Sequence, residues 1–236
     1  MGDADFDWAA AVMERRRQRY AEYSPVFWRP ATDVTAGHAQ FMRALAGRDG
    51  GFAIRSDDGF VLSYPQGGRC FVDDFAVTAD HLWASQGRDL LLALWSTARS
   101  PDQTVLRVVT ARRDEAKRSM LTALGLEVAA RWWVKEVSPV TEPTAWGPVT
   151  LGGVEAVIAP APPVYDPGGP VCLLGDLDPS LADDAVRVAA ELGAVLAIVQ
   201  YESDPSDHVP GLEAAGFHNP SEHYDGDPIR HADTEA

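Results

Sequence analysis

The chain has 236 residues, of which 46% are hydrophobic and 23% charged, a length that allows one large domain or two small ones. The formal net charge of −15 repels phosphate backbones at long range, so nucleic acid is not expected as a partner. Cys70 and Cys172 lie in separate apolar runs, which predicts two buried free thiols rather than a disulfide or a metal clip.

The N-terminal sequence "MGDADFDWAA" is acidic and lacks the basic and apolar regions of a secretory signal. No apolar run approaches the roughly 20 residues that a membrane-spanning helix needs. We therefore expect a cytoplasmic protein with no membrane partner. The histidines show no tight spacing with carboxylates or cysteines, so no metal is expected.

The first half alternates between helical and strand patterns, which predicts an α/β protein of the α+β type with helices packed on a mixed sheet. The turn cluster Ser56-Asp57-Asp58-Gly59 separates two apolar runs and predicts a β-hairpin. In chain order we predict helices 7–23 and 35–46, hairpin 51–64, strand 70–77, helix 86–99, strand 104–111, helix 113–124 and strand 127–137.

The second half repeats this theme in a shorter form after residues 138–148, whose three prolines and one glycine predict a linker. Both halves contain a helix that ends in glycine, in "LTALGLE" and "LEAAGFH", which suggests an internal duplication. The predicted elements are strand 170–177, helix 179–192, strand 194–202, helix 207–215 and strand 217–224. The predicted domains are 1–137, 149–226 beyond the linker, and a disordered tail at 227–236. A duplicated chain of this kind is a monomer with an internal pseudo-dimer, or a homodimer.

The segment "AVTADHLWASQGRDLLLAL", residues 76–94, passes from a strand into a helix through the small residues Ala84, Ser85 and Gly87. A helix N-terminus carries unpaired N–H groups and a partial positive charge, and small residues let a phosphate approach them. The same residues are equally compatible with a tight turn that binds nothing.

The residues from Val77 to Leu91 resemble motif A of the GCN5-related N-acetyltransferases (GNAT). In that family a strand ending in valine is followed by Gln/Arg-x-x-Gly-x-Gly/Ala and a helix that begins with paired leucines. Here Leu82, Ser85 and Gly87 fall at the three motif positions, and Leu90-Leu91 match the leucine pair. The segment "DEAKRSMLTALGLE" is similar to the family's second signature helix. The resemblance covers roughly residues 20–137.

The resemblance implies the GNAT fold in the first half and a degenerate, truncated GNAT-like copy in the second. It also implies transfer of an acetyl group from acetyl-CoA to a small-molecule or peptide amine. The implied cofactor contacts are the strand edge at Phe75, Ala76 and Val77 and the diphosphate loop. The loop residues are Ser85, Gln86, Gly87, Arg88 and Asp89. Among acidic residues, Asp74 is the candidate base and Asp73 the second choice, although a strand aspartate can also cap a loop or hold an arginine.

Several positions depart from the family pattern. Leu82 cannot donate a hydrogen bond, and Leu121 stands where many members have a tyrosine that protonates the leaving thiolate. Tyr64 is one of the tyrosines that could approach from elsewhere. A non-catalytic GNAT-like protein that binds acyl-CoA, or a structural or interaction protein, therefore stays an alternative. The "ERRR" cluster at 14–17 is interpreted as a solvated helix face rather than a ligand patch, and Trp83 as a residue that shields the cofactor or packs against the second half.

Overall fold

The chain divides into two compact units, each of which is discontinuous in sequence. The computed structural model describes residues 1–32, 34–143, 146–151, 153–175, 177–201 and 207–229. Unit 1 holds the described residues within 1–19, 33–128 and 223–236, and unit 2 those within 20–32 and 129–222. The units differ from the contiguous domains predicted above, because strands β6 (Glu127–Glu136) and β11 (His218–Gly226) each have residues in both units.

The sheet of unit 1 has the strand order β1-β2-β3-β5-β11, and β4 pairs with β2. The predicted hairpin is confirmed, since the Ser56 N–H donates to Gly59 O at 2.8 Å and closes the turn. β2 pairs antiparallel with β3, and β3 pairs parallel with β5. The strand bounds are β1 (Phe52–Arg55), β2 (Gly59–Gln66), β3 (Arg69–Val72), β4 (Phe75–Val77) and β5 (Val105–Ala111).

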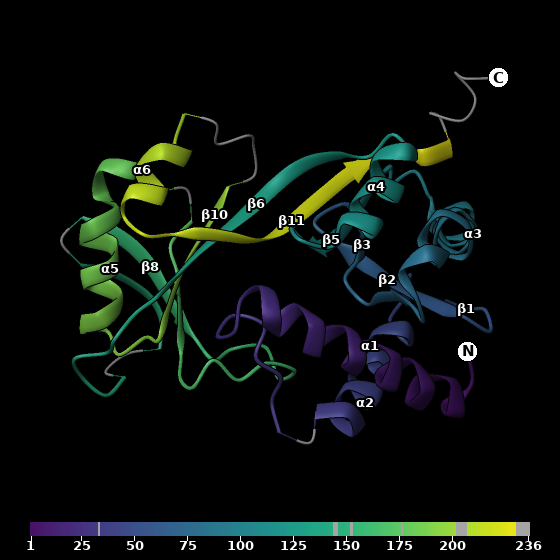
Figure 1. The fold of residues 1–236 in the computed structure, drawn as a ribbon, viewed down its shortest axis with the longest axis horizontal. Helices are drawn as coiled ribbons and strands as arrows, with labels where there is room; N and C mark the ends of the chain where they lie inside the picture. Colours follow the sequence, from purple (N-terminus) through teal and green to yellow (C-terminus); the bar gives the residue numbers. More distant parts are fainter. Residues whose placement is uncertain (33, 144–145, 152, 176, 202–206, 230–236) are drawn as a thin grey trace. The chain divides into compact units, whose positions relative to one another are not determined.

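Helices cover both faces of this sheet, as Figure 1 shows around β2. On one face, α1 (Asp3–Tyr23) and α2 (Val34–Ala46) pack on Phe60, Leu62 and Ala76. On the other face, α3 (Arg88–Ala98) and α4 (Glu115–Ala123) pack on strand residues that include Val61, Val72 and Phe75. Alternate residues of β2 thus enter different cores, because successive side chains of a strand point to opposite faces.

Unit 2 has the strand order β6-β10-β9-β8-β7 within residues 129–222. β10 pairs antiparallel with β6 and parallel with β9, while β9, β8 and β7 follow as antiparallel neighbours. The new elements are β7 (Gly147–Leu151), β8 (Val154–Ala159), β9 (Val171–Leu173), α5 (Ala182–Glu191), β10 (Leu196–Tyr201) and α6 (Val209–Ala214).

The described residues of the predicted linker, 138–143 and 146–148, lie inside unit 2 rather than between the units, and residues 144–145 lie outside the described residues. Its residues are tied to α5, since the Val140 N–H donates to Ala190 O at 3.1 Å and Thr141 Oγ1 to Glu191 O at 2.8 Å. The hairpin β7–β8 that follows was missed, although β8 alternates buried and exposed residues along its length.

The two halves of the chain repeat one order of elements. β1, β2, β3, α3, β5, α4 and β6 in the first half correspond to β7, β8, β9, α5, β10, α6 and β11 in the second. The pairings correspond as well: two antiparallel pairs are followed by one parallel pair in each unit. The glycines that end α4 and α6, Gly125 and Gly216, both have positive φ angles, which ends a helix without a Cβ clash.

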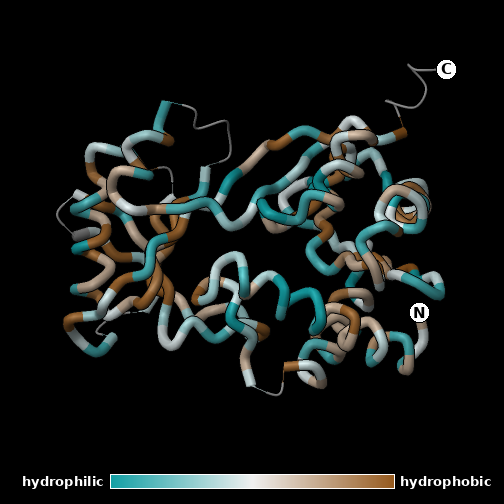
Figure 2. Tube along the Cα trace, viewed as in Figure 1, coloured by the Kyte–Doolittle hydropathy of each residue, from teal (hydrophilic) through white to brown (hydrophobic). Residues whose placement is uncertain are grey.

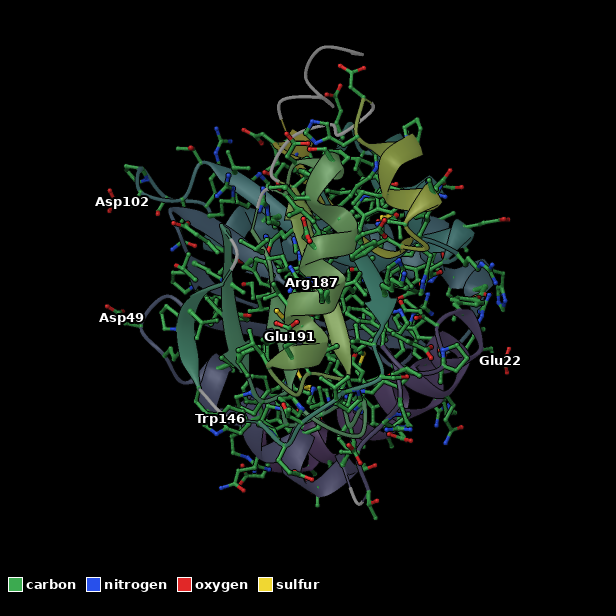
Figure 3. The ribbon with its side chains drawn as sticks, turned by 90° about the vertical axis from the view of Figure 1, so that its left-hand side faces the viewer. Glu22, Asp49, Asp102, Trp146, Arg187 and Glu191 are labelled. Carbon is green, nitrogen blue, oxygen red and sulfur yellow. The ribbon has the colours of Figure 1, made fainter. Side chains whose placement is uncertain are left out.

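Helix α5 covers the sheet of unit 2 with an apolar face that includes Ala185, Val188 and Ala189. Hydrophobic and hydrophilic residues alternate along it in Figure 2. Figure 3 shows Arg187 and Glu191 together on its outer face, where their side chains form an ion pair at 2.9 Å.

Both cysteines are buried free thiols, as predicted. The predicted disordered tail is wrong at Asp227, which accepts a hydrogen bond from Trp95 Nε1 at 2.9 Å. Residues 230–236 of that tail lie outside the described residues. Among the described helices, none combines the length and the apolarity needed to cross a membrane.

Candidate functional site

The predicted third strand of unit 1 is interrupted at Asp73 and Asp74. Pairing between β3 and β5 runs from Arg69 and Val105 to Val72 and Val108, and it ends there. After the interruption the chain continues as β4, for which the described residues show pairing with β2 alone. The β4 edge that the resemblance assigned to the donor therefore lies where β4 and β5 have separated.

Lys117 fills the place between the separated strands. Its Nζ donates to Val109 O of β5 at 2.8 Å and to Phe75 O of β4 at 3.5 Å. The side chain is only 2% exposed and lies over the rings of Phe75 and Trp83. Burial lowers the pKa of Lys117 to about 7, with a further lowering by the nearby Arg16 charge, while neighbouring aspartates oppose the shift.

Arg16 of α1 joins the beginnings of two helical segments. It forms a buried ion pair with Asp114, the N-cap of α4, and lies 3.7 Å from Asp80, where the helical segment before α3 begins. Its guanidinium also stacks 4.7 Å from the centre of the Trp83 ring. The structure thus buries Arg16 and Arg17, at 7% and 1% exposure, and the interpretation of 14–17 as a solvated face is wrong for these two residues.

The predicted diphosphate loop is helical. A 3-10 helix, Asp80–Leu82, and a π-helix, Trp83–Gly87, lead directly into α3. The Arg88 N–H donates to Ser85 O and Trp83 O, so the prediction of a free amide is wrong at Arg88. The Arg88 side chain is exposed and pairs with Asp89.

The burial of Trp83 explains why this segment is helical. Its ring is 1% exposed and meets Phe75 edge-on at 4.7 Å, so the chain turns inward to bury it. A Cβ on Gly87 would lie 2.5 Å from Trp83 Cε3. Packing against Trp83 therefore accounts for the glycine that the motif assigned to a phosphate.

The two acidic candidates have different surroundings. Asp74 is buried, and its Oδ1 lies 2.9 Å from His38 Nε2. His38 Nδ1 in turn contacts the guanidinium of Arg17. Because Arg17 can only donate, Nδ1 accepts, and the remaining Nε2–H donates to Asp74. Asp74 is thus held by a histidine, a partner that neither interpretation of this aspartate named.

Asp73 is the exposed carboxylate of the pair. Surrounding protein removes part of its hydration although solvent still reaches it, and this raises the pKa of Asp73 to about 6, with a further contribution from the Asp74 charge. Burial, followed by the charges of Asp73 and Asp74, also raises the pKa of Tyr64 well above its usual value. Tyr64 and both carboxylates therefore share one electrostatic environment.

A pocket of about 190 Å³ lies beside the end of β4. It is lined by Arg15, Arg16 and Arg19 of α1 and by residues 77–80, and Asp80 pairs with Arg19 inside this lining. Arg16 of this lining also pairs with the buried Asp114, so the three arginines and the two aspartates together carry one net positive charge, which favours an additional anion. Among the described residues, no group of histidine, cysteine and acidic side chains is placed to hold a metal ion.

No model of a protein family matches the sequence, and no curated protein matches it. A solved structure from Thermoplasma acidophilum, described as a candidate acetyltransferase, is similar over 89% of this chain and 88% of its own, with a TM-score of 0.56 and 9% identity. Another candidate acetyltransferase, from Pyrococcus horikoshii, is similar over 96% of this chain and 87% of its own, with a TM-score of 0.53 and 11% identity. The chain has the GNAT fold.

The GNAT fold brings some of the predicted site residues together and separates others. Phe75, Asp73 and Asp74 lie at the strand interruption, and Lys117, which the sequence did not single out, lies among them. Ser85 and Gln86 belong to the π-helix instead of a loop. The sequence feature that could have indicated Lys117 is its position in the second motif, about two helical turns before Gly125. The motif does not show that this side chain points between β4 and β5.

Proposed function

We propose that this chain is an N-acetyltransferase that uses acetyl-CoA, with the reaction carried by unit 1. The observation that supports it is the end of β3–β5 pairing at Asp73, next to an exposed carboxylate whose pKa is raised. The gap is bordered by the Phe75 and Val109 carbonyls, which converge on one ammonium group in the structure. This ammonium group belongs to Lys117. It occupies the positions from which the amide N–H groups of a bound donor arm would donate to these two carbonyls.

The residues that would hold acetyl-CoA differ in part from those predicted. The backbone of Phe75, Ala76 and Val77 stays the proposed contact for the donor arm, and Val109 faces it from β5. The anionic end fits the pocket of Arg15, Arg16 and Arg19 better than it fits the helical Ser85–Arg88 segment. When bound, acetyl-CoA supplies an acetyl thioester beside Asp73.

Asp73 is the proposed base. An amine acceptor is protonated in water and must lose a proton before it can attack a carbonyl. A carboxylate with a pKa near 6 accepts that proton better than an ordinary surface aspartate, because its conjugate acid is weaker. Asp74 does not compete for this role, since His38 holds it. The net charge of −15 favours a cationic small-molecule or peptide amine as the acceptor.

The test combines binding and turnover. Isothermal titration with coenzyme A and a thiol-release assay with acetyl-CoA over a panel of polyamines, aminoglycosides and peptides are run on the full chain. The proposal expects binding, acceptor-dependent thiol release, and loss of release in Asp73→Asn with binding retained. Binding without release for any amine would contradict it.

A non-catalytic GNAT-fold protein is the second candidate, and a specific observation favours it. The chain's own groups fill the positions that a donor would use: Lys117 lies in the gap, Asp80 pairs with Arg19 in the arginine pocket, and the Arg88 N–H is bonded within its helix. Under this second proposal, coenzyme A neither raises the melting temperature nor gives heat in the titration.

A further inference from the structure

Lys117 is an unusual amine in this chain. The sequence contains 20 basic side chains, of which only Lys117 and Lys135 are lysines. Both Nζ atoms donate to backbone carbonyls, Lys117 to Val109 and Phe75 in unit 1 and Lys135 to Ala215 in unit 2. Lys117 is 2% exposed and lies in the proposed donor gap, whereas Lys135 is half-buried on its strand.

The contacts of Lys117 orient its nitrogen. Two N–H groups are directed to carbonyl oxygens of opposite strands, at 2.8 and 3.5 Å. In the neutral amine, the lone pair then points away from both oxygens. Because burial lowers the pKa of Lys117 to about 7, a large fraction of the side chain is neutral near neutral pH. A neutral amine beside the donor site is a competent nucleophile.

We propose that Lys117 is itself an acyl acceptor: an acyl thioester bound between β4 and β5 transfers its acyl group to Lys117 Nζ. This inference rests on the proposed function, because it needs a thioester in the strand gap. A C–N bond forms between Nζ and the acyl carbon, and the C–S bond breaks. The sulfur leaves with the bonding electron pair and receives the proton that Nζ loses. The products are Nε-acyllysine at position 117 and a free thiol.

Burial makes this modification selective for a bound donor. A reagent in bulk solvent reaches the half-buried Lys135 or the N-terminal amine more readily than a side chain that is 2% exposed. A thioester arm that takes over the Phe75 and Val109 carbonyls is in the opposite situation, since it lies beside the Lys117 Nζ that it displaces from them. The order of reactivity of the two lysines therefore depends on whether the donor binds.

The experiment compares two acetyl donors on the wild-type full chain. One sample receives acetyl-CoA and the other acetyl phosphate, a small reagent that needs no binding site. Intact mass measures each addition of about 42 Da, and peptide mapping assigns it to Lys117, Lys135 or the N-terminus. Coenzyme A binding is titrated on the same preparation. Lys117→Arg and Lys135→Arg, which keep a positive charge, serve as a matched pair.

The proposal expects acetyl-CoA to modify Lys117 ahead of Lys135 and acetyl phosphate to give the reverse order. Lys117→Arg loses the acetyl-CoA product, and Lys135→Arg keeps it. If coenzyme A binds and an amine is acetylated while Lys117 stays unmodified, the inference is wrong and the proposed function stands. Equal modification of Lys117 by both donors also overturns it. If coenzyme A does not bind, the proposed function fails first and the inference falls with it.

Discussion

His38 Nε2 and Asp74 Oδ1 are 2.9 Å apart, and their side chains are 2% and 7% exposed. This pair connects α2 to the strand interruption, while Arg17 connects His38 to α1. Asp74 is therefore held on the face of the sheet that carries α1 and α2, and the adjacent Asp73 is left exposed. One of two neighbouring carboxylates is structural, which leaves the other available for chemistry.

Replacing His38 by alanine removes the hydrogen-bond donor that Asp74 faces. A buried group that loses its hydrogen-bond partner destabilises a fold by about 1–3 kcal/mol, and a charged group such as this carboxylate by more. We therefore expect His38→Ala to lower the free energy of unfolding by this order, measured by urea denaturation at pH 7.

Asp49→Asn and Asp102→Asn are suitable controls for this measurement. Both side chains project from the surface in Figure 3, and neither substitution should change the midpoint measurably. A His38→Ala protein as stable as these controls would show that Asp74 is satisfied by other groups.

The sequence predicted the elements whose signals are local. The hairpin at 51–64 follows from a turn cluster between two apolar runs, and α4 follows from an N-cap at Asp114 and a terminating Gly125. These features depend on residues within a few positions of each other, so they can be recognised without knowing the fold.

The centre of the candidate site depends on contacts between distant segments and could not be predicted in the same way. Arg16 and Asp114 are 98 residues apart, and Lys117 reaches Phe75 across 42. The helical form of 80–87 is set by the burial of Trp83, which no local pattern indicated. A motif shows which residue types lie close together in the sequence. Packing in the folded chain decides which of their backbone and side-chain groups remain available to a ligand.

Gly87→Ala tests whether Trp83 packing requires the glycine. The new Cβ would lie 2.5 Å from Trp83 Cε3, and such overpacking costs about 1–3 kcal/mol. Alanine gains about 1 kcal/mol over glycine in a helix, which offsets only part of this cost. We expect a net loss of stability in thermal unfolding, with no ligand present.

Gly37→Ala in α2 is the matched control, because nothing lies within 4 Å of a Cβ at that position. This variant should be more stable than wild type, by up to about 1 kcal/mol. If Gly87→Ala behaves like Gly37→Ala, then Trp83 has room to move and the segment is more adaptable than its packing indicates.

Lys117→Met tests the lowered pKa of Lys117 through the pH dependence of stability. In the unfolded chain the lysine titrates near its ordinary value of 10.5, whereas in the folded chain it titrates near 7. Between these values the unfolded state binds one more proton, so wild-type stability rises with pH, by up to about 1.4 kcal/mol per unit. Below about pH 7 this contribution is constant.

The measurement is urea denaturation at several pH values from 7 to 10. The stability of wild type minus that of Lys117→Met should increase with pH over this range, because methionine does not titrate. Gly37→Ala should keep the wild-type slope. A constant difference between wild type and Lys117→Met would mean that Lys117 stays charged in the folded protein.

Asp73→Asn tests the proposed base. Removing a general base typically lowers the rate by a factor of about 10²–10⁴, and the isosteric amide should leave both the fold and coenzyme A binding intact. For wild type, activity should fall as the pH decreases through about 6, where the Asp73 carboxylate takes up a proton. The residual rate of Asp73→Asn should lack this step. An unchanged pH profile in the variant would assign the proton transfer to another group, and Tyr64, which shares the environment of Asp73, would be the next residue to replace.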